Sequence, residues 1–154
     1  MKTSKAEAPV KVFRILLVDD NRNGLLARKS VLEEHGYQVS AYSSPNDALA
    51  EFSEQPYDLV VTDYRMPRMN GAQLIAEIRD LTPKVPIVLV SGVVDVLGLD
   101  EKTTGANIVI PKSSTEITHL IRAVKRLLPT PAPKKPVRSQ SGKNADKQTG
   151  SKGG

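Results

Sequence analysis

The chain has 154 residues, of which 39% are hydrophobic, 25% are charged and none is cysteine. This length suits one domain with a sizeable core, and the lack of cysteine excludes disulfides, thiol chemistry and cysteine-ligated zinc. No run of 18 or more apolar residues indicates a membrane span, and the first residues, MKTSKAEAPVK, do not resemble a secretory signal. A cytoplasmic location is therefore expected.

Strand-like and helix-like segments alternate between residues 12 and 128. Short apolar, β-branched runs predict buried strands at 12–19, 37–43, 57–63, 86–92 and 106–112. Between the strands, one helix is predicted at about 22–35 and a second begins at 45. A third runs from 71 to just before 83, and the last begins after 113. A short or mobile helix is expected within 93–105. This alternation predicts an α/β fold, a doubly wound (βα)5 sandwich whose parallel five-stranded sheet has the order 2-1-3-4-5.

Several helix ends are marked by the residues that usually cap them. Ser44 and Asn70 each precede a helical pattern, where a short polar side chain can accept a backbone N–H. Gly36 is placed to end the first helix. Ser113 and Glu116 have the spacing of a capping box and are expected to open the last helix.

The two ends of the chain differ from its middle. The net charge of +5 arises in residues 130–154, which hold six Lys or Arg and one Asp, whereas residues 1–129 are balanced. We expect a flexible arm at 1–11, one folded domain at 12–129, and a disordered basic tail rich in Pro, Lys and Gly at 130–154. A solubilising or tethering tail is favoured over nucleic-acid binding, because no aromatic residue is interleaved with its charges.

Three aspartates stand at the ends of two predicted strands. Asp19 and Asp20 close the run VFRILLVDD, and Asp63 closes DLVVTD. If these strands are neighbours in a parallel sheet, the three carboxylates meet at the edge where open α/β sheets bind ligands. Carboxylates so close repel one another unless a divalent cation lies among them. The pattern predicts a hard-metal site, with one carboxylate available as a nucleophile.

Residues 12–128 resemble the receiver (CheY-like) domain of two-component response regulators, of the single-domain type. The motifs that carry the resemblance are Asp19-Asp20, Asp63 within VVTDYRMPRMNG, Ser91 within VLVSG, and Lys112 after GANIVIP. The resemblance implies a flavodoxin-like fold. It also implies that a histidine kinase or a histidine phosphotransfer protein donates a phosphoryl group to the chain in a Mg²⁺-dependent reaction.

The resemblance assigns a role to each motif residue. It implies that Asp63 is the phosphoacceptor, that Asp20, Asp63 and the backbone carbonyl of Arg65 bind Mg²⁺, and that Asp19 acts through a metal-bound water. It further implies that Lys112 contacts the phosphoryl oxygens, that Ser91 hydrogen-bonds the attached phosphoryl group, and that Gly92 keeps access open. The chain would then be a phosphoacceptor that assists its own phosphorylation and dephosphorylation, and not an enzyme.

Two positions depart from the family's pattern. The family usually has a proline after the lysine, joined through a cis peptide, whereas Ser113 follows Lys112 here. A cis bond before serine costs about 3 kcal/mol, so this loop is expected to be rebuilt. The family also usually has a Tyr or Phe where this chain has Val109, so the usual aromatic switch that moves with Ser91 is missing.

Several alternatives stay open at this stage. The departures suit a degenerate receiver that binds proteins constitutively, and the chain could also be a piece of a hybrid kinase or a longer regulator. A phosphatase of the haloacid dehalogenase kind would need a D-x-D spacing that VDDNRNG lacks. A kinase partner is expected to dock at Asn21–Leu26 and Lys112–Thr115. The apolar strip at 93–99 would serve either as a docking surface or as the packing face of a short helix.

Overall fold

The computed structural model describes residues 11–129, and within them Val12–Pro129 form one compact unit. The strands are β1 Arg14–Val18, β2 Gln38–Tyr42, β3 Leu59–Asp63, β4 Ile87–Ser91 and β5 Ile108–Pro111. They pair in parallel in the order β2-β1-β3-β4-β5, as predicted. The order reverses beside β1, so the ends of β1 and β3 adjoin at the switch point of the sheet.

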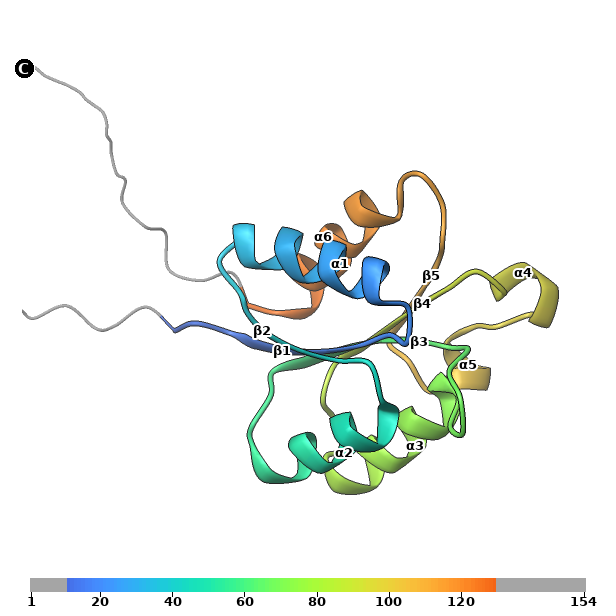
Figure 1. Cartoon of the computed structure of the whole chain (residues 1–154), viewed down its shortest axis with the longest axis horizontal. Helices are drawn as coiled ribbons and strands as arrows, with labels where there is room; N and C mark the ends of the chain where they lie inside the picture. The colour runs from blue at the N-terminus through green and yellow to red at the C-terminus, as the bar shows by residue number, and fades with distance from the viewer. Residues whose placement is uncertain (1–10, 130–154) are drawn as a thin grey trace, which may run out of the picture. The chain divides into compact units, whose positions relative to one another are not determined.

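Helices cover both faces of this sheet (Figure 1). They are α1 Arg22–Glu34, α2 Pro45–Glu54, α3 Gly71–Leu81, α4 Val94–Leu97, α5 Glu101–Thr104 and α6 Glu116–Leu127. Helices α1 and α6 lie on one face, and α2 and α3 lie on the other (Figure 1). The doubly wound, flavodoxin-like fold predicted from the sequence is therefore confirmed. None of these helices, all within residues 11–129, is long and apolar enough to cross a membrane.

The alternation of side chains along β1 divides the core into two layers. Ile15 and Leu17 pack on the side of α1 and α6, while Leu16 and Val18 pack on the side of α2 and α3. All four side chains are fully buried. Each contributes about 1.5–3 kcal/mol by leaving water, which fixes the register of β1 and hence the position of the residues that follow it.

The predicted helix starts are mostly confirmed. Ser44 caps α2 by accepting the N–H of Asp47 at 3.3 Å. Asn70 accepts the N–H of Gln73 at 2.9 Å, and the Gln73 side chain accepts the N–H of Asn70 at 2.8 Å. Gly36 follows α1 with φ at 93°, a conformation that favours glycine.

The capping box predicted for the last helix is wrong. The N-cap of α6 is Thr115, and it makes no capping hydrogen bond through its side chain. Ser113 instead accepts the N–H of Thr115 through its hydroxyl at 3.2 Å. The Glu116 carboxylate binds the buried guanidinium of Arg28 at 2.8 Å, because a charged donor outcompetes a backbone N–H for a carboxylate.

The weakly helical segment 93–105 forms two four-residue helices, α4 and α5, separated by Gly98 at a φ of 63°. No residue of α4 is buried, and Val96 is 80% exposed. Val93, Val94 and Leu99 are partly buried, whereas Val96 and Leu97 are exposed, so the strip divides between packing and an open apolar surface. The expected arm, apart from Lys11, and the expected basic tail lie outside the described residues.

Candidate functional site

The three aspartates come together at the carboxyl end of the sheet. Val18 pairs with Thr62 across β1 and β3, so Asp19 lies beside Asp63. One oxygen from each of Asp19, Asp20 and Asp63 lies within 4.8 Å of the others. Asp19 and Asp63 are buried, whereas Asp20 is exposed. The cluster therefore has two fixed carboxylates and one that faces solvent.

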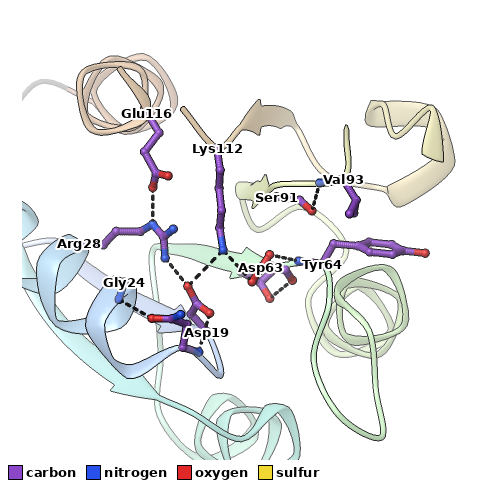
Figure 2. A network of polar contacts seen from close by, with 11 residues as sticks. Asp19, Gly24, Arg28, Asp63, Tyr64, Ser91, Val93, Lys112 and Glu116 are labelled. Atoms are coloured by element: carbon purple, nitrogen blue, oxygen red, sulfur yellow. Dashed lines mark hydrogen bonds and ion pairs between the residues drawn. The ribbon is translucent and has the colours of Figure 1, made fainter. Parts of the chain in front are cut away.

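Both oxygens of Asp63 are engaged (Figure 2). The N–H of Tyr64 donates to Oδ1 at 2.7 Å, and Nζ of Lys112 donates to Oδ2 at 3.0 Å. Burial raises the pKa of Asp63 above its ordinary value, the Lys112 ammonium opposes this rise, and the Asp19 charge adds to it. The carboxylate is thus held in place but is costly to keep charged, a condition that favours binding of another cation.

Lys112 reaches the cluster from the end of β5. Its N–H donates to the carbonyl of Ser91 at 2.9 Å, which continues the pairing of β5 with β4. Its Nζ lies 3.0 Å from Asp63 and 3.9 Å from Oδ2 of Asp19. The Lys112–Ser113 peptide bond is trans. With this trans bond, the Lys112 ammonium group still lies within hydrogen-bond distance of Asp63.

Asp19 is bound by a residue that the sequence analysis did not single out. Its Oδ1 accepts the N–H of Asn21 at 2.9 Å, and its Oδ2 binds the guanidinium of Arg28. Burial alone would lower the pKa of Arg28, but hydrogen bonds and charge from Glu116 and Asp19 outweigh this effect and raise it. The sequence does contain a sign of this role. Arg28 lies on the same helical face as Leu25 and Leu32, where an apolar residue is expected, and a charged residue at such a position indicates a buried partner.

Ser91 and Val109 lie on β4 and β5, the two strands that follow β3 in the sheet. Ser91 ends β4 and is 1% exposed, and its hydroxyl accepts the N–H of Val93 at 3.2 Å. Val109, at the middle of β5, is partly buried and packs on the side of α2 and α3. Gly92 leaves open space: a Cβ placed there would meet only Cδ of Lys112, at 3.9 Å.

The donor set suits a hard divalent cation. Carboxylate oxygens are the ligands that Mg²⁺ prefers, and one from each aspartate is within reach of a common point. Asp20 and Arg65 line a hollow that opens beside the cluster; its remaining lining residues are Tyr64, Met66, Pro67 and Asn70. This hollow offers a metal ion, or a small anionic group, a route to the carboxylates from solvent.

Comparison with curated proteins finds similar segments in bacterial regulators and sensors. The chain is 38% identical over 78 residues to the C4-dicarboxylate transport transcriptional regulatory protein DctD of Rhizobium meliloti, covering 51% of the chain and 17% of that protein. It is 36% identical over 87 residues to the sensor protein EvgS of Escherichia coli, covering 54% of the chain and 7% of that protein. The chain thus spans a small part of the length of these relatives.

Solved structures and a family model agree with this similarity. The response regulator TrrA from Thermotoga maritima, solved in complex with Mg(2+)-BeF, has a TM-score of 0.69 and 32% identity, covering 76% of this chain and all of that one. A response regulator receiver domain protein from Clostridium thermocellum has a TM-score of 0.68 and 29% identity, and the match covers 75% of this chain and 94% of that one. The family model of the response regulator receiver domain matches residues 15–125. The chain therefore belongs to the family of response regulator receiver domains.

Proposed function

We propose that the chain accepts a phosphoryl group on Asp63 from a histidine kinase or a histidine phosphotransfer protein. An Asp63 carboxylate oxygen would attack phosphorus, forming an O–P bond, while the P–N bond to the donor imidazole breaks and the nitrogen keeps the electron pair. The observation that carries the proposal is the Asp63 carboxylate, fixed beside two further carboxylates and 3.0 Å from the Lys112 ammonium. Such a transfer depends on positioning and charge neutralisation more than on covalent help.

We propose Mg²⁺ as the cofactor, held by Asp20, Asp63 and the backbone carbonyl of Arg65, with Asp19 acting through a water. When bound, Mg²⁺ would supply the positive charge that the acidic cluster lacks and that the phosphoryl oxygens require. The proximity of the three carboxylates supports this assignment. The solved complex of the similar Thermotoga maritima protein with Mg(2+)-BeF supports it as well.

Lys112 and Ser91 are proposed to contact the phosphoryl group. The ammonium of Lys112 already lies at Asp63 and would neutralise one phosphoryl oxygen. The Ser91 hydroxyl accepts the N–H of Val93 at 3.2 Å through its oxygen, and its own O–H would donate to a phosphoryl oxygen. Because the same hydroxyl holds Val93, a shift of Ser91 toward the phosphoryl group would move the start of the segment that leads to α4. Because Val109 replaces the family's aromatic residue, the signal would pass through this segment and not through an aromatic switch.

The proposed partners act at two surfaces. Leu26 on α1 is 58% exposed and lies in the segment where kinase or phosphotransfer partners are expected to dock. Val96 and Leu97 on α4, 80% and 45% exposed, form an apolar surface for a downstream protein. The chain would act through such contacts, in the cytoplasm, as a phosphoacceptor that assists its own phosphorylation and dephosphorylation and is not an enzyme.

Acetyl phosphate labelling tests the proposal. The full chain, the Asp63→Asn variant and an Asp95→Asn control on exposed α4 are incubated with acetyl phosphate and Mg²⁺, with and without EDTA, and weighed by intact mass spectrometry. We expect one added phosphoryl group in the wild type and the control, and none in Asp63→Asn or with EDTA. Absence of labelling in a folded wild type would favour a degenerate receiver that binds proteins without being phosphorylated. Val109 and Ser113, which depart from the family's pattern, are consistent with that alternative.

A further inference from the structure

Arg28 carries a positive charge on the buried face of α1. Its side chain is only 5% exposed, although the neighbouring helical positions on this face, Leu25 and Leu32, are apolar. Figure 2 shows its guanidinium between two carboxylates, Asp19 from the end of β1 and Glu116 from α6. An isolated buried guanidinium would be prohibitively costly, so these two partners are what keep it inside.

The sequence makes room for this contact at Gly24, one turn before Arg28. A Cβ at position 24 would lie 3.2 Å from Nη1 of Arg28 and 3.2 Å from Oδ2 of Asp19. Such contacts are tighter than ordinary packing, so a larger residue would push the guanidinium and the carboxylate away from their present positions. The glycine therefore allows the guanidinium to reach the acidic cluster.

Asp19 already has two cationic side chains and one backbone N–H as partners. Its Oδ2 binds Arg28 and lies 3.9 Å from Nζ of Lys112, while its Oδ1 accepts the N–H of Asn21. A divalent cation that uses Asp19, directly or through water, must share this carboxylate with the guanidinium. The cation and the guanidinium would then repel each other, and the low exposure of Arg28 and Asp19 weakens screening of this repulsion by solvent.

We infer that Arg28 is a positioning residue that lowers the affinity of the site for Mg²⁺, and that Glu116 raises this affinity by balancing the charge of Arg28. The inference rests on the proposed metal site. It assigns opposite effects to two residues that bind each other. A merely structural role would instead make the loss of either residue damage the site in the same direction.

The test measures Mg²⁺ affinity directly on the full chain. The chain has no tryptophan, so binding is followed by the electron paramagnetic resonance of Mn²⁺ and its displacement by Mg²⁺. We expect Arg28→Met to tighten Mg²⁺ binding by on the order of tenfold, because a neighbouring positive charge is removed. We expect Glu116→Gln to weaken it by about threefold, because the charge of Arg28 is then less balanced.

Three further variants separate this effect from damage to the fold. In Arg28→Met/Glu116→Gln, the tenfold gain and the threefold loss should combine, so Mg²⁺ should bind about threefold more tightly than to the wild type. The matched controls are Lys29→Met and Glu33→Gln, which make the same charge changes at an exposed ion pair on α1 and should leave affinity unchanged. Circular dichroism verifies folding of each variant.

Each result has a defined meaning. If both single variants weaken Mg²⁺ binding, or neither changes it, the inference is wrong while the metal site stands. If Arg28→Met does not fold, Glu116→Gln still decides, because it keeps the buried guanidinium: an unchanged affinity there overturns the inference. Asp20→Asn and Asp63→Asn should abolish Mn²⁺ binding. If the wild type binds no Mn²⁺, or if these variants bind it as the wild type does, the proposed metal site is wrong, and so is the inference that rests on it.

Discussion

The ammonium group of Lys112 lies 3.0 Å from Oδ2 of Asp63, although the two residues are 49 positions apart in the sequence. Parallel pairing of β5 with β4, and of β4 with β3, brings these residues to the same edge of the sheet. The Lys112 side chain is about one-third exposed, so it can reach both Asp63 and a group that enters from solvent. The contact places a positive charge at the proposed point of phosphoryl transfer.

Replacing Lys112 by Met should slow labelling of Asp63 by acetyl phosphate by about a hundredfold, a typical cost of losing one charge-stabilising donor. The initial rate is read by intact mass at saturating Mg²⁺. Lys125→Met, an exposed lysine on α6, provides the matched control and should label at the wild-type rate. Equal rates for the two variants would contradict the role proposed for Lys112.

Asp63→Asn should stabilise the chain in EDTA by about 1 kcal/mol. Burial raises the pKa of Asp63, so the charged carboxylate is less favourable in the folded state than in the unfolded chain. Stability from the neutral carboxyl is complete below the unfolded pKa and is lost as the pH rises through the folded pKa. The advantage of Asp63→Asn, measured by urea unfolding, should therefore grow with rising pH and shrink in acid.

Adding Mg²⁺ should reverse this ranking. The ion binds the folded cluster and stabilises the wild type by mass action, and it stabilises Asp63→Asn less, because one carboxylate ligand is missing. Unfolding midpoints with Mg²⁺ and with EDTA give both differences. A midpoint that Mg²⁺ raises equally in both proteins would argue against Asp63 as a ligand.

Gly71→Ala should destabilise the fold by roughly 3 kcal/mol. A Cβ at this position would lie 2.3 Å from the carbonyl oxygen of Asp63 and 2.9 Å from Cα of Tyr64, so the backbone beside the proposed phosphoacceptor must move. Gly92→Ala is the control, since its Cβ would have only ordinary contact, and its stability should change by less than about 0.5 kcal/mol. Urea unfolding of the two variants measures the difference.

The guanidinium of Arg79 on α3 links the segments that precede β4 and β5. It donates to the carbonyls of Val85 at 2.6 Å and Gly105 at 3.0 Å, and to Oδ1 of Asn107 at 2.8 Å. The same Asn107 oxygen accepts the N–H of Ile87 at 2.8 Å. Arg79→Met should destabilise the chain by about 2 kcal/mol, because the partly buried carbonyl of Val85 and the exposed acceptors of Gly105 and Asn107 all lose a charged donor.

The control for this substitution is Arg122→Met, which removes an exposed arginine on α6. Its unfolding midpoint in urea should stay close to that of the wild type. Because Arg79 lies far along α3 from the acidic cluster, Arg79→Met should also retain labelling of Asp63 when it is folded. Loss of labelling in the folded variant would show that the Arg79 contacts also shape the site.

Local features of the sequence were enough to predict the sheet and the meeting of the three aspartates. The apolar runs that became β1 and β3 are too short and too β-branched for buried helices, and parallel strands necessarily share one carboxyl edge. Once Asp19 and Asp63 were placed at strand ends, their proximity followed from the strand order. The helix starts at Ser44 and Asn70 were equally predictable, because a capping residue acts on a backbone N–H only three residues away.

Only the tertiary structure decided what Arg28 and Glu116 do. They are 88 residues apart, and their 2.8 Å contact exists because α1 and α6 pack on the same face of the sheet. The local pattern assigned Glu116 to a capping box, and nothing local indicated which residue would pair with Arg28. A carboxylate chooses the strongest donor within reach, and which donor is within reach is set by packing between distant segments. The sequence alone therefore predicted which aspartates form the cluster, whereas the placement of Arg28 and Glu116 beside it depended on the tertiary structure.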